Sequence, residues 1–405
     1  MKVPITCLKI LFLTLLFSLN VAEASPTQSP ALTLVYHGEV EDGIKAMDVS
    51  ADGSYFAVGG RGFVRFYSTA ERSVVWIHKF RDMVDSLSIS PDGRFLAVGT
   101  EGATVYLFDR ASATPLWRFA AGGPVLSISF LEDGKHFCAG TFGGTVYLFS
   151  VHGSEPLWRF ELGGQTAILA VDASLNRVLA GSSNNLLMVF SMFGPEPLLS
   201  YETDGYVRSV SLSACGSRAI VGSNGSSVYF INFGYGVEVL RREAGGPVRA
   251  VATSSNGEKS VAGGEEGKVY FFSGWGRKLE WSFDAGDVIT SVSVSSDGKY
   301  ICAGGFGMKL YFFKSSSGDP IFTHRTKYPI SSTIASSRGG LVAASAGRAF
   351  YIFQAARGAS IGLPLNPVLF WLGLEAALLI PLILHETGLR KKRLARRGGR
   401  ADARD

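Results

Sequence analysis

Apolar and polar residues alternate in short runs along most of the chain, and turn residues separate the runs. In the stretch 122–160, GGPVLSISFLEDGKHFCAGTFGGTVYLFSVHGSEPLWRF, the runs are Val125–Phe130, His136–Ala139, Thr145–Phe149 and Pro156–Phe160. Alternation over four to eight residues, bounded by Asp-Gly or glycine-rich turns, predicts β-strands joined by tight turns. The stretch therefore predicts one antiparallel unit of four strands.

The same unit recurs with a nearly fixed period. Its small-glycine step recurs every 41 residues, at Gly99, Gly140, Gly181, Gly222, Gly263 and Gly304. An earlier copy at Gly59 lies 40 residues before Gly99, and a degenerate copy at Ser345 lies 41 residues after Gly304. About 40 to 45 residues with four strands per unit is the period of propeller blades. Eight copies predict an all-β, eight-bladed β-propeller of four-stranded blades.

Two strands of the unit indicate how blades pack. The third strand, for example Val146-Tyr147-Leu148-Phe149, is apolar on both faces, as expected for a sheet that is covered on both sides. The fourth strand carries a large apolar residue in successive copies, which predicts packing anchors between blades. These residues are Trp76, Trp117, Trp158, Leu199, Leu240, Trp281 and Phe322.

The ends of the repeat array predict how the ring closes. The last unit has only three predicted strands, Ile330–Ala335, Leu341–Ala344 and Ala349–Phe353. A lone strand at Ala31–Tyr36 precedes the first unit. Pairing that strand with the last unit removes an unpaired edge, so we expect an N-terminal strand to close the last blade. The predicted propeller spans residues 31–357.

Both ends of the chain predict targeting to a membrane. Residues 1–24 have the pattern of a signal peptide with an Ala-x-Ala cleavage site, and residues 25–30 form a short leader. Residues 363–384 are long and apolar enough for one C-terminal transmembrane α-helix, and residues 385–405 form a basic tail. Because basic flanks stay in the cytoplasm, the pattern predicts a single-pass type I protein of the cell membrane with an extracytoplasmic propeller. A retained N-terminal anchor and a buried C-terminal helix are the alternatives.

The predicted membrane helix and its flank contain further candidate contacts. Glu375 lies near the middle of the helix, where an ionisable residue either pairs with a partner helix or stays protonated without a partner. The cluster Arg390, Lys391, Lys392 and Arg393 is explained by its topogenic role, and contact with anionic lipid is a second hypothesis.

Charge and chemistry exclude several classes of function. Residues 25–360 contain 29 basic and 29 acidic side chains, so the repeat region has no net charge and no footprint for nucleic acid. The six histidines are scattered without metal-ligand spacing, and no phosphate-binding loop or nucleophile elbow is present. We therefore expect no catalytic, cofactor-binding or metal residues.

The cysteines do not suggest a disulfide framework. Cys138 and Cys302 occupy the same second-strand position four periods apart, which is too far for a bridge. Cys215 replaces the turn aspartate found at Asp133 and Asp297, so it should lie at a surface turn. All three are predicted to be unpaired.

Candidate binding residues are those that vary while the scaffold repeats. The upper ends of the first strands carry Lys45, Asp85, Leu126, Ala167, Arg208, Arg249, Thr290 and Ser331. Arg208 and Arg249 are then neighbours, either as an anion site at the mouth of the central channel or as solvated rim charges.

Loops between second and third strands should open on the same face as the first-strand ends. They carry Arg61, Glu101, Phe142, Asn184, Asn224, Glu265 and Phe306. Exposed Phe142 and Phe306 either anchor a partner or fold over a neighbouring blade. Asn224-Gly225-Ser226 matches the N-glycosylation sequon.

The repeat resembles two known families. Residues 90–99, SPDGRFLAVG, followed by TVYLF at 104–108, resemble the WD40-like repeat, although its Gly-His and Trp-Asp pairs are missing. The spacing from Asp109 to Trp117 is similar to that of quinoprotein-type eight-bladed propellers, without residues that would carry over quinone binding. The resemblance implies a rigid interaction platform.

Together these patterns predict a non-enzymatic, membrane-anchored scaffold that binds a protein or cell-envelope component through a loop face. One alternative is a quinoprotein-like enzyme or small-ligand sensor that uses the central channel. Another alternative is a subunit of a membrane complex that assembles through the Glu375 helix.

Overall fold

A computed structural model describes residues 32–355 of the chain, except 164–165, 235 and 337–339. These residues form thirty β-strands, and no helix occurs among them. The predicted signal peptide, leader, membrane helix and basic tail lie outside the described residues, and Glu375, Arg390, Lys391, Lys392 and Arg393 lie there with them. Within the described part of the chain, no helix has the length and apolar character needed to cross a membrane.

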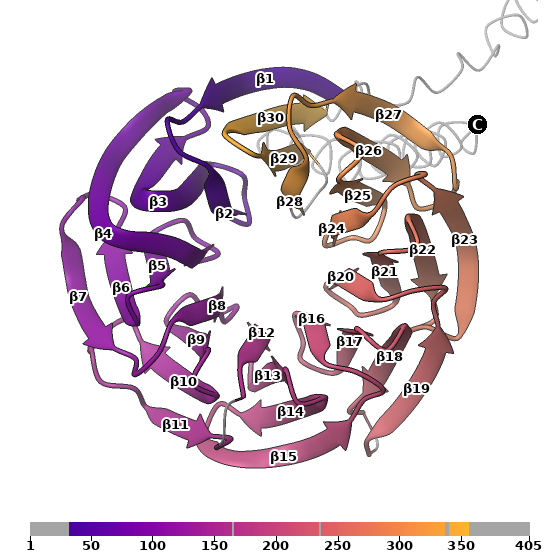
Figure 1. The fold of residues 1–405 in the computed structure, drawn as a ribbon, viewed down its shortest axis with the longest axis horizontal. Helices are drawn as coiled ribbons and strands as arrows, with labels where there is room; N and C mark the ends of the chain where they lie inside the picture. Colours follow the sequence, from indigo (N-terminus) through magenta and orange to yellow (C-terminus); the bar gives the residue numbers. More distant parts are fainter. Residues whose placement is uncertain (1–31, 164–165, 235, 337–339, 356–405) are drawn as a thin grey trace, which may run out of the picture. The chain divides into compact units, whose positions relative to one another are not determined.

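The strands form antiparallel sheets that are arranged as propeller blades, with first strands innermost and fourth strands outermost (Figure 1). Six sheets have four strands each. The first of them consists of β8(Val125–Phe130), β9(His136–Thr141), β10(Thr145–Ser150) and β11(Trp158–Glu161). The next consists of β12(Ile168–Ser174), β13(Arg177–Ser182), β14(Leu186–Ser191) and β15(Gly194–Glu202). A third consists of β16(Val207–Leu212), β17(Arg218–Ser223), β18(Ser227–Asn232) and β19(Glu238–Glu243). Two more are β20(Val248–Thr253), β21(Lys259–Gly264), β22(Lys268–Ser273) and β23(Lys278–Asp284); and β24(Ile289–Val294), β25(Tyr300–Gly305), β26(Lys309–Lys314) and β27(Pro320–Arg325).

The predicted number of eight blades is wrong. Taking each hydrogen-bonded sheet as one blade, the described residues form seven blades, because the first two repeats share a single sheet. This sheet has six strands. They are β2(Ile44–Val49), β3(Tyr55–Ser68), β4(Ser73–Ile89), β5(Phe95–Thr100), β6(Thr104–Asp109) and β7(Pro115–Ala120).

Two local changes explain the six-stranded sheet. The turn after Gly60 is one residue shorter than the turn after Thr100, so β3 continues through the position where other repeats separate their second and third strands. Residues 81–83 are Arg-Asp-Met, whereas the corresponding residues in two other repeats are Gly-Gly-Pro, at 122–124 and 245–247. Without glycine or proline to interrupt it, β4 runs from the outer strand of the first repeat into the inner strand of the second.

The ring is closed as the sequence predicts. β1(Leu32–Glu39) pairs antiparallel with β30(Ala349–Ala355), and it completes a sheet with β29(Leu341–Ala346) and β28(Ile330–Ala335). The N-terminal strand therefore supplies the outer strand that the last repeat lacks. β2 lies beside β28 and β29, so the first and last repeats are also neighbours in space (Figure 1).

The recurring glycine makes room for the neighbouring repeat. A Cβ atom built on Gly140 would lie 2.5 Å from Cγ2 of Ile168, the first residue of the next inner strand. The same contact recurs with Val125 at Gly99 and with Ile289 at Gly263, again at 2.5 Å. From the second repeat on, each repeat thus inserts a β-branched side chain above a glycine of the preceding repeat, and a larger residue in place of that glycine would push the two repeats apart.

The predicted packing anchors are confirmed at the tryptophans. The indole N–H of Trp76, Trp117, Trp158 and Trp281 donates to a backbone carbonyl 34 residues further along the chain, at 2.9 to 3.2 Å. Each anchor therefore binds the next repeat by a hydrogen bond as well as by packing of its ring, which is buried in Trp76 and Trp158 and half-buried in Trp117 and Trp281. The apolar residues of the third strands are largely buried, as in Val146 and Leu148 of β10, each 0% exposed.

We expect Gly140→Ala to destabilise the propeller by about 1–3 kcal/mol, because its Cβ would overlap Ile168 and the well-packed seam has no room for it. Chemical denaturation followed by tryptophan fluorescence measures this change. Removing Cγ2 of the opposing side chain relieves the overlap, so Gly140→Ala with Ile168→Ala should cost less than the sum of the two single substitutions.

Gly153→Ala is the matched control. A Cβ on Gly153 would meet no atom within 4 Å, so this variant should unfold within about 0.5 kcal/mol of the wild type. Equal effects of the two alanine substitutions would contradict the role given to Gly140.

Candidate binding face at the inner strand ends

Two sets of loops lie on one face of the ring, as predicted. The backbone N–H groups of Glu101, Phe142 and Phe306 donate, at 2.8 to 3.0 Å, to carbonyls of the segment that joins one repeat to the next, which in the case of Glu101 is part of β4. Loops between second and third strands are therefore tied to the starts of the inner strands. We call this side of the ring the bulge face, because a β-bulge or register irregularity marks each inner strand there.

Every inner strand has a β-bulge or register irregularity at its second residue. In each repeat the first and third residues pair with consecutive residues of the second strand, which leaves the second residue without a partner. Such a bulge directs one side chain away from the regular ladder. The bulge residues are Lys45, Asp85, Leu126, Leu169, Arg208, Arg249, Thr290 and Ser331.

Seven of these positions agree with the sequence prediction. In the fourth repeat the bulge residue is Leu169 and not the predicted Ala167. The reason is that Ile168 is the first paired residue of its inner strand, as Val207 is in the next repeat. Ala167 lies just before the strand, and its N–H donates to Ser183 Oγ at 2.9 Å.

The structure brings Arg208 and Arg249 together on one carboxylate. Arg249 places Nη2 2.8 Å and Nε 2.9 Å from Glu265 Oε1, and Arg208 Nη1 lies 3.5 Å from the same oxygen. The guanidinium of Arg249 also lies 5.6 Å from the ring centre of Phe306, and that of Arg208 lies 5.7 Å from the ring centre of Tyr206. Two cations share one anion, so the cluster keeps one positive charge.

The other candidate residues lie at different places on this face. Phe142 is 62% exposed and Phe306 is 48% exposed, although the latter contacts Arg249 of the neighbouring repeat. Arg61 is exposed but lies inside β3, opposite Met83, and not in a loop. Asn224 lies in a turn and is half-buried, and its N–H donates to Tyr206 O at 2.9 Å.

The opposite arc of the bulge face carries an acidic residue near a lysine. Burial raises the pKa of Asp85, the bulge residue of the second repeat, while the positive charge of Lys45 acts in the other direction. The negative charge of Glu101 also acts to raise the pKa of Asp85. The arc around Asp85 therefore differs in charge from the arc around Arg208.

The described surface includes two hollows near the candidate residues and turns. One, of about 440 Å³, lies on the bulge face between the fourth and fifth repeats and is lined by Leu169, Ser183, Tyr206 and Arg208. Leu169 and Tyr206 were not singled out by sequence reasoning. Tyr206 could have been noticed, because it stands directly before an inner strand where two other repeats have Pro124 and Pro247.

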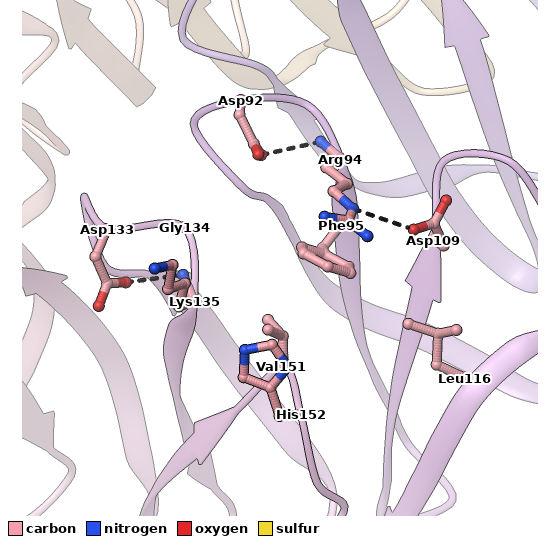
Figure 2. A pocket seen from close by; sticks show the side chains of 10 residues that line it. All are labelled: Asp92, Arg94, Phe95, Asp109, Leu116, Asp133, Gly134, Lys135, Val151 and His152. Atoms are coloured by element: carbon pink, nitrogen blue, oxygen red, sulfur yellow. Dashed lines mark hydrogen bonds and ion pairs between the residues drawn. The ribbon is translucent and has the colours of Figure 1, made fainter.

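The second hollow, of about 300 Å³, lies at the first-to-second strand turns of the second and third repeats (Figure 2). Its carboxylates are occupied by neighbouring groups. Asp92 accepts the N–H of Arg94 at 3.1 Å, Asp109 pairs with Arg94 Nε at 3.4 Å, and Asp133 accepts the N–H of Lys135 at 2.8 Å. These contacts hold the turns, so the hollow is a consequence of the scaffold.

Side chains of the inner strands connect neighbouring repeats. Ser127 and Ser209 accept backbone N–H groups of the next inner strand, each at 3.1 Å. Two positions carry aspartate in this role. Asp48 accepts the N–H of Ile89 at 2.8 Å, and Asp172 accepts the N–H of Leu212 at 2.7 Å.

Burial raises the pKa of Asp48 and of Asp172 to about 6, although the hydrogen bonds that they accept act in the opposite direction. The sequence did not single out either residue, since aspartate is common in turns and neither lies in a motif. Both carboxyl groups bridge repeats from inside the ring.

The cysteines lie where the sequence predicts. Cys138 and Cys302 are buried, Cys215 is exposed, and none of the three forms a disulfide. Partial burial acts to raise the pKa of Cys215, but hydrogen bonds with Ser213 and Ser217 outweigh it and lower the pKa below the ordinary value. Elsewhere in the described ranges, no three His, Cys, Asp or Glu side chains group as metal ligands would.

Comparisons with known proteins agree with this architecture. The family model PQQ_2, described as outer membrane protein assembly factor BamB, matches residues 60–265, just over half of the chain. No curated protein matches the sequence. The resemblance to quinoprotein-like and WD40-like propellers is thereby confirmed at the level of the repeat and the fold.

Many solved structures share the fold. The Dos1 propeller has a TM-score of 0.66 and 15% sequence identity, covering 80% of this chain and 95% of that chain. Sqt1 of Chaetomium thermophilum, solved bound to the N-terminus of the ribosomal protein L10, has a TM-score of 0.68 and 15% identity, covering 81% of this chain and 100% of that chain. At this identity the likeness shows the fold alone.

We expect Asp172 to make stability depend on pH. Its pKa in the folded protein, about 6, lies above the ordinary value of 3.8, so the folded state binds the proton more tightly between these values. The contribution of Asp172 to the free energy of unfolding should therefore rise by about 1 kcal/mol as pH falls from 7 to 5. Denaturation at both pH values, in wild type and Asp172→Asn, measures the difference.

Asp297→Asn is the control, because the pKa of Asp297 is lowered: partial burial acts to raise it, but hydrogen bonds from Ser295 and Lys299 outweigh that effect. Its contribution should change little between pH 7 and 5. A wild-type minus Asp172→Asn difference that is the same at both pH values would refute the assignment.

Proposed function

The chain belongs to the family described as outer membrane protein assembly factor BamB, and we propose that it is a non-enzymatic platform that binds a protein partner through the bulge face. The observation that carries this proposal is the exposure of two phenylalanines on that face. Phe142 is 62% exposed and Phe306 is 48% exposed, and large aromatic side chains are typical anchors of protein interfaces.

The positions of the two rings favour a broad partner. Phe142 lies between β9 and β10, and Phe306 lies between β25 and β26, on opposite sides of the ring (Figure 1). A ligand that contacts both must reach across the face. A protein surface or a long segment meets this requirement, whereas a small molecule does not.

Charge is distributed to support such an interface. The cluster of Arg208, Arg249 and Glu265 provides one positive charge near Phe306, and the arc around Asp85 provides acidic groups elsewhere on the face. Complementary charges at the rim of an interface favour one orientation of the partner. The face therefore combines anchors with a means of orientation.

The turns between first and second strands, on the face opposite the bulge face, favour a binding role over a catalytic role. Asp92 accepts the hydroxyl of Ser90 at 2.6 Å and Asp297 accepts that of Ser295 at 2.7 Å. These carboxylates serve their own turns. Sqt1, which has the same fold, holds the N-terminus of a ribosomal protein, and the family description names an assembly factor, so both are consistent with a platform.

We further propose that the propeller is extracytoplasmic and anchored by the C-terminal segment 363–384. The support is the sequence alone: the signal-like residues 1–24, the apolar run and the basic tail. Contact of Glu375 with a partner helix, and of the tail cluster with anionic lipid, remain proposals of the same kind.

Replacing both anchors, in Phe142→Ser with Phe306→Ser, should weaken partner binding at least tenfold, because two exposed aromatic anchors of the interface are lost. Proximity labelling from the propeller in native membranes identifies the partner. Binding of the purified partner to wild type and variant then gives the dissociation constants.

Leu198→Ser is the matched control. Leu198 is 60% exposed on the outer strand β15, away from the bulge face, so its replacement should leave the dissociation constant unchanged. Thermal unfolding checks that all variants are folded. If the double variant binds the partner as tightly as wild type, the bulge face is not the interface.

Cys215 gives a test of the membrane topology. It is the one exposed cysteine of the described residues, and its lowered pKa favours reaction with maleimide. In cells that produce the full chain and keep an intact cytoplasmic membrane, a biotin-maleimide that cannot cross this membrane but reaches its outer side should label the protein, and Cys215→Ser should abolish the labelling.

Buried Cys138 and Cys302 should react only after denaturation, which controls for unfolded material. Labelling of Cys215 that requires the cytoplasmic membrane to be permeabilised would place the propeller inside the cell and overturn the proposed topology.

A further inference from the structure

The hollow between the fourth and fifth repeats is built from bulge residues of two neighbouring strands. Leu169 comes from β12 and Arg208 from β16, and both are the unpaired second residues of their strands. Ser183 and Tyr206 complete the lining from the adjacent loops. One side of the hollow is therefore charged, and the other side is apolar and aromatic.

Arg208 is the less tightly held of the two arginines. Its Nη1 lies 3.5 Å from Glu265 Oε1, whereas Arg249 approaches the same oxygen to 2.8 Å. Across the described residues, the salt link to Glu265 is the one polar contact that Arg208 makes through its side chain. The Arg208 side chain is 32% exposed, so its guanidinium keeps donors available toward the hollow.

The apolar side of the hollow fits an aliphatic group. Leu169 is half-buried, and the Tyr206 ring, held beneath the Arg208 guanidinium at 5.7 Å, is 37% exposed. Ser183 Oγ accepts the N–H of Ala167, so its own proton can be donated to a ligand. The lining thus offers a hydroxyl and a guanidinium beside an apolar wall.

These features define the class of ligand. A guanidinium binds a planar carboxylate through two parallel hydrogen bonds. The single net charge of the arginine cluster matches a monoanion better than a phosphate dianion. We propose that this hollow binds a carboxylate of the protein partner, from an acidic side chain or a chain end, together with an adjacent apolar side chain. The inference rests on the proposed function.

Small probes test the hollow directly on the full-length protein in detergent. N-acetyl-leucine presents a terminal carboxylate, acetyl-Glu-Leu-amide presents a side-chain carboxylate, and acetyl-Gln-Leu-amide is neutral. At least one of the two acids should bind, as measured by ligand-observed NMR, and the neutral probe should bind at least tenfold more weakly. The acid that binds identifies the source of the carboxylate.

Variants assign the binding to Arg208. Arg208→Gln should weaken binding of the acid at least tenfold. Arg208→Lys should weaken binding less, because lysine keeps the positive charge but lacks the two parallel N–H donors of the guanidinium. Arg118→Gln on the outer strand β7 removes the same charge elsewhere and should have no effect. Thermal unfolding confirms that each variant is folded.

The inference is overturned if neither acid binds, if Arg208→Gln binds as well as wild type, or if inorganic phosphate competes as strongly as the acids. It is also overturned if Arg208→Gln loses the acid but keeps full affinity for the protein partner. The proposed function survives that last result, since it depends on Phe142 and Phe306 and is tested by their replacement.

Discussion

The seam between successive repeats is the contact on which the ring depends. A β-branched residue at the start of one inner strand, such as Ile168, fills the space above a glycine of the preceding repeat, such as Gly140. Glycine is required there because its Cβ position is occupied by the neighbour. This contact sets how closely inner strands approach, and side chains such as Ser127 and Asp172 can then bridge them. The bulge residues lie on the same strands, so the packing between repeats also determines how the side chains of the candidate binding face are spaced.

Much of this architecture can be predicted from sequence because it repeats. The glycine step, the tryptophan anchors and the missing strand of the last repeat are all visible as positions along the chain, and the structure gives each a contact. The number of sheets could not be predicted in the same way. Whether two repeats share one sheet depends on a single residue missing after Gly60 and on the residues 81–83, and neither changes the count of repeats.

The candidate site was only partly visible in the sequence. The periodicity placed Arg208 and Arg249 side by side, but Glu265 reaches them from a different loop, and no spacing predicts which carboxylate a pair of arginines will share. Two additional residues before Ile168 shifted the fourth repeat, which hid Leu169. The bulges have no sequence signature, since the residues there range from aspartate to leucine.

The continuous strand β4 has a mechanical consequence for the whole ring. A propeller opens most easily between blades, where side chains rather than backbone ladders hold neighbours together. Between the first two repeats, that gap is crossed by an unbroken strand, so these repeats form a single cooperative unit of folding. This unit stands beside the junction where β1 meets β30 and the two ends of the propeller chain come together. The first repeat is thus stabilised against separation from the ring at the junction of the two chain ends, where a closed ring is otherwise least stable.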